Sequence, residues 1–255
     1  MDLDLKRRVA LVTGSSQGIG SAAAVLLGSE GARVGVTYHQ HRDKATAVVE
    51  AIERAGSEAL AVPLDLAEID SVTAAARSVL DRWGRIDILV NNAVQWPSRA
   101  PWQMPPFEDL PAAEWRPFLR AHTEGPYAAI QAVLPSMRAL GWGRIVNVSS
   151  GVAVDGVPGA GPYAAAKAAL HGLTRTLSKE LGPAGILVNV VMPGVTLTER
   201  MVTALPAAVR RQREQASPIR RLLPPEEVVP TIAFLCSGAN TAVTGEVIRA
   251  SGGIT

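Results

Sequence analysis

The sequence predicts an α/β protein with one doubly wound parallel sheet and helices on both faces of that sheet. Two observations lead to this fold class. Short apolar runs, mostly of β-branched residues, alternate with longer alanine-rich segments of helical character along all 255 residues. No Pro/Gly/Ser-rich linker and no internal repeat divides the chain, so we expect a single domain over residues 1–255.

About seven strands are expected, one from each apolar run. In chain order the runs are residues 9–13, 33–37, 58–62, 87–90, 144–149, 186–191 and 246–250. Their alternation with helical segments is typical of a parallel sheet. In such sheets ligands bind beyond the carboxyl ends of the strands, where the strand order reverses. The residues that follow each run are therefore the candidates for function.

Composition excludes several classes of function. Hydrophobic residues make up 47% of the chain, and the formal net charge of +2 is too small to indicate a nucleic-acid-binding surface. The N-terminal apolar run is too short for a signal peptide and no segment is long enough to span a membrane, so we expect a cytoplasmic protein. The single cysteine, Cys236, excludes an intrachain disulfide and lies in an apolar stretch that predicts a buried thiol. No metal site is predicted.

The first expected strand runs into a glycine-rich sequence, TGSSQGIG, at residues 13–20. Gly14, Gly18 and Gly20 allow a tight turn and a close approach of the backbone, and the next helix offers its free N-terminal N–H groups to a pyrophosphate. The spacing is GxxxGxG rather than the commoner GxGxxG. Its place in the first strand-turn-helix unit favours a Rossmann-type dinucleotide site over a plain connection.

A tyrosine and a lysine lie four residues apart in the sequence GPYAAAK, residues 161–167. An early proline followed by alanines predicts a helix that continues to about residue 182. Tyr163 and Lys167 therefore share one face of a helix. Taken alone, the pair is compatible with a solvated surface as well as with an active site.

Six motifs in order make the chain resemble the short-chain dehydrogenase/reductase family over nearly its full length, and most closely its 3-oxoacyl-carrier-protein reductase-like branch. They are TGSSQGIG at 13–20, DLAEID at 65–70, NNAV at 91–94, NVSS at 147–150, YAAAK at 163–167 and PGVTLT at 193–198. Each motif alone is weak, but six at family-like spacing are very specific. The resemblance implies hydride transfer between a nicotinamide cofactor and a carbonyl or secondary alcohol.

The resemblance also assigns the proton chemistry. Tyr163 would donate the proton to the developing oxyanion, and the positive charge of Lys167 one turn away would favour the phenolate. In the family the same lysine holds the nicotinamide ribose. Ser150 would hydrogen-bond the substrate oxygen, with Ser149 as the alternative within the same motif.

Cofactor contacts are carried over from the family residue by residue. Asp65 is expected to bond the adenine amino group and Asn91 and Ala93 to line the adenosine side, although Asp65 and Asn91 could also be plain turn formers. Val94 departs from the family, which usually has a glycine there. The expected cofactor-binding residues are Gly14, Ser16, Gln17, Gly18, Ile19, Gly20, His39, Asp65, Leu66, Asn91, Ala93, Tyr163, Lys167, Pro193, Gly194 and Thr198.

The end of the second expected strand bears on the choice between NAD(H) and NADP(H). An acidic residue there would take the ribose hydroxyls and repel a 2′-phosphate. Thr37 and Tyr38 occupy that place instead, and the partly basic stretch HQHR follows at residues 39–42. We therefore expect NADP(H) to be preferred and NAD(H) to be used less. The stretch could also be a solvated loop, and residue 17 in the glycine-rich turn is a glutamine rather than a basic residue.

Two segments are expected to bound the substrate site. One is a Pro-rich loop, residues 94–111, with Trp96 and Trp102; the other is a lid, residues 195–221. The tryptophans indicate an apolar substrate, ring-shaped or acyl, or else anchor the loop. The lid region carries six arginines, which could meet an acyl-carrier protein or the phosphopantetheine arm of such a carrier or CoA thioester, or form a solvated face. They are Arg200, Arg210, Arg211, Arg213, Arg220 and Arg221.

Two functional classes are compatible with these residues. The favoured one is an NADP(H)-dependent carbonyl reductase or alcohol dehydrogenase, possible substrates including a 3-oxoacyl thioester or a related ketone. The alternative is a nucleotide-binding regulatory or scaffold protein without turnover, which would not need the intact set Ser150, Tyr163 and Lys167. Relatives pair the helix bearing YAAAK and the long helix before it, so a homotetramer is expected, with a dimer next.

His122 occupies the place where the family usually has an asparagine, whose backbone carbonyl holds a water near the active-site lysine. In a helix that carbonyl would accept from the N–H four residues later, but residue 126 is a proline and has no N–H. We expect the His122 carbonyl to be free for the same relay, so His122 is counted with the catalytic residues. Alternatively, Pro126 only bends the helix around the core.

Overall fold

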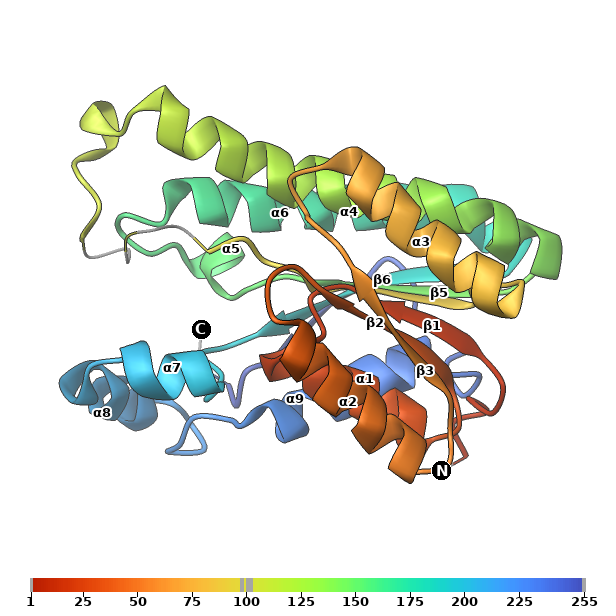
Figure 1. Ribbon diagram of the computed structural model, residues 1–255. Helices are drawn as coiled ribbons and strands as arrows, with labels where there is room; N and C mark the ends of the chain where they lie inside the picture. The colour runs from red at the N-terminus through yellow and green to blue at the C-terminus, as the bar shows by residue number, and fades with distance from the viewer. Residues whose placement is uncertain (1, 97–98, 100–102, 254–255) are drawn as a thin grey trace.

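The computed structural model describes residues 2–96, 99 and 103–253 and contains one seven-stranded, entirely parallel sheet (Figure 1). The strands are β1 (Val9–Val12), β2 (Arg33–Tyr38), β3 (Ala59–Pro63), β4 (Ile88–Asn91), β5 (Gly143–Val148), β6 (Ile186–Pro193) and β7 (Val247–Ala250). Each coincides with one of the predicted runs to within one or two residues. The predicted fold class and the number of strands are confirmed.

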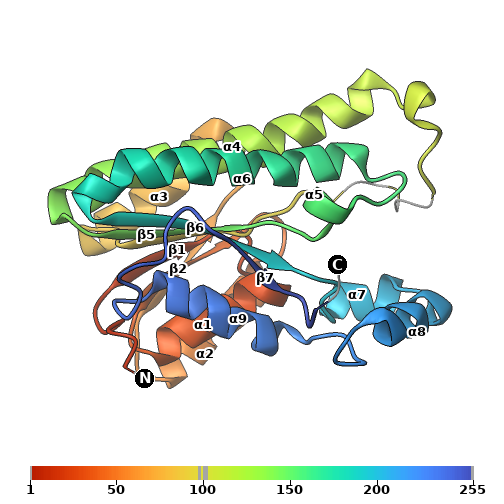
Figure 2. The ribbon, with the colours of Figure 1, turned by 180° about the vertical axis from the view of Figure 1, so that it is seen from behind.

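Helices cover both faces of the sheet (Figures 1 and 2). On one face lie α1 (Gly18–Ser29), α2 (Arg42–Arg54) and α9 (Pro225–Cys236), and on the other α3 (Ile69–Trp83), α4 (Ala112–Leu140) and α6 (Gly161–Leu181). Shorter helices are η2 (Phe107–Asp109), α5 (Val152–Asp155), η3 (Gly182–Ala184), α7 (Glu199–Ala204) and α8 (Ala207–Ala216). Among the described residues, no helix is both long enough and apolar enough to cross a membrane.

The strands are apolar on both faces because each face is covered. Along β1, Ala10 and Val12 belong to the core under α1, α2 and α9, while Val9 and Leu11 belong to the core under α3 and α4. Side chains of a strand alternate between the two faces, so a parallel strand buried on both sides appears as an unbroken apolar run. The same packing buries the thiol of Cys236 completely, and burial raises its pKa.

The strand order is β3-β2-β1-β4-β5-β6-β7. Strands β2 and β3 therefore extend the sheet on one side of β1, and β4 to β7 extend it on the other side. Val12 at the end of β1 is in register with Val36 of β2 on one side and with Val90 of β4 on the other. Connections leave β1 and β4 toward opposite faces of the sheet, which opens a crevice above β1. This places the candidate site at the carboxyl ends of β1, β4 and β5.

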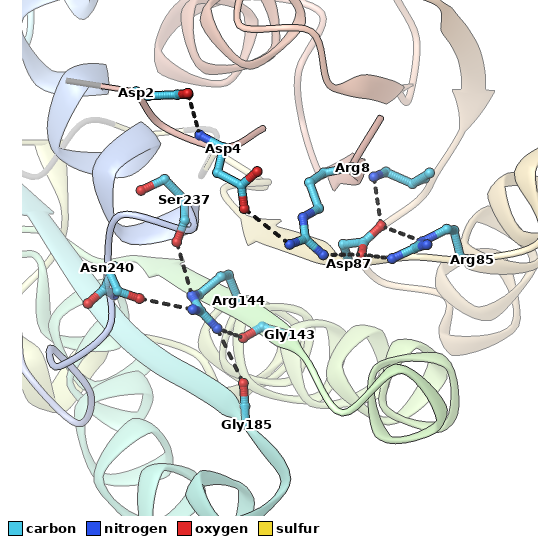
Figure 3. Close-up of polar contacts among 11 residues, drawn as sticks. Asp2, Asp4, Arg8, Arg85, Asp87, Gly143, Arg144, Gly185, Ser237 and Asn240 are labelled. Carbon is cyan, nitrogen blue, oxygen red and sulfur yellow. Dashed lines mark hydrogen bonds and ion pairs between the residues drawn. The ribbon is translucent and has the colours of Figure 1, made fainter. Parts of the chain in front are cut away.

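A buried arginine holds the opposite end of the sheet together (Figure 3). Arg144 donates from its guanidinium to the carbonyl oxygens of Ser237 at 3.2 Å, Asn240 at 2.9 Å and Gly185 at 3.2 Å. Burial, and then the nearby charge of Arg8, lower the pKa of Arg144 to about 10. Both guanidiniums lie over the ring of Trp142, at 4.3 Å for Arg144 and 3.8 Å for Arg8.

A buried carboxylate next to this arginine ties the amino ends of β1 and β4 together. Asp87, whose side chain is fully buried, accepts from the backbone N–H of Val9 at 2.9 Å and pairs with Arg8 at 3.3 Å and with Arg85. A buried charge is tolerated when it is paired and hydrogen-bonded. Charged groups therefore hold the amino end of the sheet together, and the candidate ligand site lies at the carboxyl end.

Replacing the buried arginine tests this anchor. Arg144→Ala should lower the free energy of unfolding by about 2 to 4 kcal/mol, because several buried carbonyl oxygens lose their donor at roughly 1 to 3 kcal/mol each. Urea unfolding followed by circular dichroism measures the change. Arg77→Ala, at an exposed position in the middle of α3, is the matched control and should change the free energy by less than about 0.5 kcal/mol. Equal effects of the two variants would contradict the anchoring role.

Candidate active site

Segments that follow β1, β4, β5 and β6 meet at the carboxyl end of the sheet. Thr13 joins the segments after β1 and β4. Its hydroxyl donates to Val90 O at 3.3 Å and accepts from the backbone N–H groups of Asn92 at 2.9 Å and Ala93 at 3.0 Å. The side-chain amide of Asn92 donates back to the carbonyl oxygens of Thr13 and Gly14, both at 3.0 Å. The glycine-rich turn is thereby fixed to the segment after β4.

The glycine-rich turn has the shape of a cradle for a phosphate group. Gly14 has a positive φ of 63°, and a Cβ on it would lie 2.7 Å from the Cα of Ala93. A Cβ on Gly20 would lie 2.3 Å from Gly14 O. Only glycine fits these two places. Gln17, at the N-cap of α1, makes no side-chain capping bond, so first-turn N–H groups of α1 remain available to an anionic ligand. These residues fit a dinucleotide pyrophosphate.

Thr37 joins the turn to the end of β2. Its hydroxyl accepts from Gly14 N at 2.8 Å, and its backbone exchanges bonds with Ser15, since Thr37 N donates to Ser15 Oγ at 2.8 Å and Ser15 N donates to Thr37 O at 3.0 Å. Beyond β2, His39 and Asp65 lie side by side, with His39 Nε2 at 3.3 Å from a carboxylate oxygen of Asp65. The structure thus brings together two residues that were predicted separately as cofactor contacts.

A chain of buried amides runs beneath the crevice. Asn91 Nδ2 donates to Asn147 Oδ1 at 2.9 Å, and Asn147 Nδ2 donates to Thr174 Oγ1 at 2.9 Å. The side-chain nitrogen of Asn91 is therefore occupied by a partner within the protein. The chain of amides links β4 to β5 and α6, and the candidate catalytic residues Ser150, Tyr163 and Lys167 follow β5 or lie on α6.

Ser150, Tyr163 and Lys167 are brought together by β5 and α6. The Ser150 side chain lies close enough to the Tyr163 hydroxyl to lower its pKa. The buried Lys167 lies one turn along α6, its Nζ 5.9 Å from the centroid of the Tyr163 ring. That Nζ donates to Val148 O, the last residue of β5, at 2.9 Å. The three side chains form a compact group beside the crevice.

Burial dominates the electrostatics of this group. Burial of the Tyr163 hydroxyl is the largest effect on its pKa and raises it, while the Ser150 side chain acts in the opposite direction. The Nζ of Lys167 donates to Val148 O and lies beside the Tyr163 ring. Burial also lowers the pKa of Lys167 to about 8. Tyr163 therefore holds its proton here, the state needed to donate it.

Ser149, the alternative to Ser150, has a different environment. It is buried, and its hydroxyl donates to Lys167 O at 3.1 Å and lies 2.8 Å from Nε2 of His171. Ser149 therefore contacts α6 through Lys167 and His171, while Ser150 is the serine that acts on the pKa of Tyr163.

The ring of His122 fastens the loop after β4 onto α4. Its Nε2 accepts from the backbone N–H of Gln95 at 3.0 Å, so the proton must be on Nδ1, which lies 2.8 Å from Phe118 O. Burial, and then the positive charge of Lys167, lower the pKa of His122 to about 4. Its neutral form is thus fixed at both nitrogens. Helix α4 continues through Pro126, which cannot supply the helical N–H donor to His122 O.

An aromatic wall faces Tyr163. Trp96 stacks with it at a ring-centroid distance of 6.2 Å and an interplanar angle of 19°, and Phe118 lies 6.1 Å away at a tilt of 57°. Arg200, on α7, places its guanidinium 4.7 Å from the centroid of Trp96. Helix α7 therefore reaches across to the loop after β4. Trp102 and residues 97–98, 100 and 101 of the predicted loop lie outside the described residues.

The remaining predicted residues lie around the same crevice. Pro193 O accepts from Gly151 N at 3.1 Å, which joins the ends of β6 and β5. Thr198 caps α7 by accepting from Met201 N at 3.3 Å, and its Cγ2 would lie 3.1 Å from a Cβ on Gly18. Gly194 lies against Ser251, and Leu66 is buried against Gly125. Ser16, Ile19 and Val94 are partly buried.

Four supporting residues are absent from the predicted set: Thr13, Thr37, Asn92 and Lys44. Thr13 and Asn92 belong to the quoted motifs TGSSQGIG and NNAV, so those motifs contained a signal for them. Lys44 contacts Gln17 and Glu199, and no motif pointed to it. Within the part of the chain that the structure describes, no group of three or more His, Cys, Asp or Glu side chains could hold a metal ion.

Comparison with known proteins gives full-length matches. A family model described as enoyl-(acyl carrier protein) reductase matches residues 14–255. The chain is 36% identical over 245 residues to the 3-oxoacyl-[acyl-carrier-protein] reductase FabG of Staphylococcus epidermidis, covering 96% of this chain and 98% of that protein. It is 36% identical over 255 residues to the FabG of Aquifex aeolicus, covering 100% of both.

Solved structures are similar over the same length. A 7α-hydroxysteroid dehydrogenase, in complex with NADH and 7-oxo glycochenodeoxycholic acid, has a TM-score of 0.92 and 31% identity over 100% of this chain and 96% of that one. The promiscuous reductase LugOII, which catalyses keto-reduction at C1 during lugdunomycin biosynthesis, has a TM-score of 0.87 and 33% identity over 98% of both chains.

The buried neutral His122 predicts a dependence of stability on pH. An unfolded histidine titrates near about pH 6.5, while the pKa of folded His122 is about 4. Between these values the unfolded state binds more protons, so lowering the pH favours unfolding, by up to about 3 kcal/mol from this residue. The His122→Asn variant should therefore lose less stability than the unmodified protein when urea unfolding is compared at pH 7 and pH 4.5. Identical losses would contradict the assignment of a neutral, buried ring.

Proposed function

The chain belongs to the short-chain dehydrogenase/reductase family and is an oxidoreductase that acts on a ketone, and we propose that it transfers a hydride between NADP(H) and the carbonyl carbon of a 3-oxoacyl thioester or a related apolar ketone. One observation carries the proposal. Tyr163, protonated and beside Ser150, lies with Lys167 across from an uncapped, glycine-lined helix N-terminus.

In this mechanism Ser150 and Tyr163 bind the substrate oxygen. As that oxygen becomes an oxyanion, Tyr163 donates its proton to it and Ser150 stabilises the charge through a hydrogen bond. The resulting phenolate is then stabilised by the Lys167 ammonium, whose charge is worth more in its buried position than in water. The bound nicotinamide would supply the hydride.

The cofactor would be held by both sides of the crevice. The turn at Gly14 to Gly20 would bind the pyrophosphate through backbone N–H groups, and Asp65 and Ala93 would lie beside the adenosine. Pro193, Gly194 and Thr198 would lie beside the nicotinamide carboxamide. Preference for NADP(H) is supported by Thr37 and Tyr38, because no carboxylate ends β2.

An apolar substrate is supported by the surroundings of Tyr163. Trp96 is 46% exposed although it stacks with the catalytic ring. Phe107 on η2, Val154 on α5 and Val202 on α7 are also exposed, and α5 and α7 lie near the carboxyl end of the sheet (Figure 1). Exposed apolar side chains from several segments mark a ligand-binding surface. We infer that residues 94–111 and the lid, 195–221, bound this substrate site, and that an acyl thioester carried by a protein or by CoA is the substrate class.

The relay through the backbone of His122 is part of this proposal. The ring is committed to Gln95 and Phe118, so it is not free to shuttle protons between solvent and Lys167. Its carbonyl has no helical N–H donor, because residue 126 is Pro126. A water held by that carbonyl would connect Lys167 to solvent and restore the proton of Tyr163 after each turnover.

Turnover with a panel of carbonyl compounds tests the function. We expect NADPH oxidation, followed at 340 nm, with at least one of several ketones and 3-oxoacyl thioesters. Tyr163→Phe should lower kcat by about a hundredfold or more because the proton donor is lost. His122→Ala should retain much of the turnover if the relay uses only the backbone. Tight NADPH binding without any turnover across the panel would favour the scaffold alternative instead, and equal inactivity of both variants would contradict the relay.

Assembly is inferred from the outer faces of α4 and α6. Tyr127 on α4 is 52% exposed and Ile69 at the start of α3 is 45% exposed, and these two line a shallow groove with Thr123 and Gln131. The alanine-rich face of α6 permits another helix to approach closely. We propose that two copies pair through these helices and that two such dimers form a homotetramer.

Sedimentation velocity at micromolar concentration should show a tetramer. Tyr127→Asp should shift the protein toward smaller species, because a charge would be buried at the pairing face. Val202→Asp, which also replaces an exposed apolar residue but lies on α7 rather than on α4 or α6, is the control and should leave the tetramer intact. A monomer in the unmodified protein would refute the assembly.

A further inference from the structure

Three segments far apart in the sequence meet at one cation, Lys44. It lies in the first turn of α2, and its Nζ is 3.2 Å from Oε1 of Gln17 and 2.8 Å from a carboxylate oxygen of Glu199. Gln17 immediately precedes α1 at the end of the glycine-rich turn, and Glu199 is the first residue of α7. The ammonium therefore joins the turn, α2 and the lid.

This cluster lies next to the end of β2. The turn that contains Gln17 is bonded to Thr37, the second-last residue of β2, and α2 begins four residues after β2 ends. In doubly wound folds the residues at the end of the second strand meet the adenosine ribose, and a basic residue nearby accommodates the 2′-phosphate of NADP. Lys44 therefore lies at the corner of the crevice where such a phosphate would be bound.

Other basic side chains at this corner are less suitable. His39 is paired with Asp65, whose carboxylate would repel a phosphate. The side chain of Arg42 is exposed, and none of its contacts with the described residues would fix it at the turn. Gln17 carries no charge but offers its Oε1 to hold the Lys44 ammonium in place. Lys44 is thus the one cation here that is anchored to the turn.

We propose that Lys44 binds the 2′-phosphate of NADP(H), and that Glu199 forms an ion pair with the same ammonium when no phosphate is bound. The proposal rests on the proposed use of NADP(H). An ammonium has three N–H donors, so Lys44 can keep its bond to Gln17 while it exchanges Glu199 for a phosphate oxygen. The exchange would release the first residue of the lid from α2. The 2′-phosphate would then be recognised and would also loosen the lid.

Charge and exposure favour this exchange. The side chain of Glu199 is 79% exposed, so the carboxylate returns to water at little cost when it is displaced. A phosphate monoester carries a charge of about −1.5 to −2 at neutral pH, against −1 for a carboxylate, and so attracts the ammonium more strongly. Lys44 is itself 38% exposed, so salt should weaken the interaction.

A matched pair of ligands isolates the 2′-phosphate without any need for turnover. ADP-ribose and ADP-ribose 2′-phosphate would be titrated into the protein by isothermal calorimetry. We expect the unmodified protein to bind the phosphorylated ligand more tightly. Lys44→Met should raise the Kd of ADP-ribose 2′-phosphate by about tenfold or more, equivalent to about 1.4 kcal/mol. The Kd of ADP-ribose itself should change by less than about twofold. Glu199→Gln should increase the affinity for ADP-ribose 2′-phosphate only, because the carboxylate that competes with the phosphate for Lys44 is removed.

Arg54→Met is the control, since it removes a cation from the other end of α2 and should change neither affinity. The inference is overturned if Lys44→Met leaves the preference for the 2′-phosphate intact, if it weakens both ligands equally, or if only Arg42→Met removes the preference. These failures would leave the proposed hydride transfer untouched. If the unmodified protein bound neither ligand, the cofactor site of the proposed function would be wrong as well.

Discussion

The reversal of strand order at β1 is the constraint on which the rest of the structure depends. Because β1 lies between β2 and β4, its carboxyl end faces a crevice, and every functional segment must be placed relative to that end. Thr13 does this with one hydroxyl, which contacts the end of β4 and the two residues after it. Asn92 returns two bonds to the turn. The cradle formed by the glycines and the segment that leads to the substrate loop thus share one set of buried polar contacts.

The buried charge of Lys167 affects the loop after β4 through His122. Its ammonium is held by a carbonyl of β5, and its field reaches His122, where it adds to burial in lowering the pKa. A neutral imidazole is what the loop after β4 requires, because only a neutral ring can accept from Gln95 N at one nitrogen while donating from the other. The lysine that we propose for the proton chemistry therefore also helps to fix the loop carrying Trp96. The Lys167 ammonium and the His122 ring that holds the loop thus influence each other within one buried region of low dielectric constant.

The strands and the glycine-rich turn could be predicted from the sequence because they depend on local patterns. A strand buried on both faces produces an apolar run, and a backbone with φ of 63° at Gly14 demands glycine. Side-chain partners could not be predicted in the same way. Lys44 and Glu199 are separated by 155 residues, and only the folded arrangement of α2 and α7 brings them together. The protonation state of Tyr163 was also beyond the sequence, because spacing places Lys167 one turn away but does not show the burial that raises the pKa of the Tyr163 hydroxyl.

The two adjacent residues that begin α7 connect the two halves of the site. Glu199 reaches back to Lys44 beside the glycine-rich turn, and Arg200 reaches across to Trp96, which stacks with Tyr163. Neither contact is strong by itself, since exposed ion pairs and exposed cation–π contacts each contribute about 1 kcal/mol or less. Weak contacts suit the proposed role of this segment as a lid, because a lid fixed by strong bonds would retain its ligands. Since both contacts originate from one short helix, α7 cannot move away from the substrate side without also straining its contact on the cofactor side.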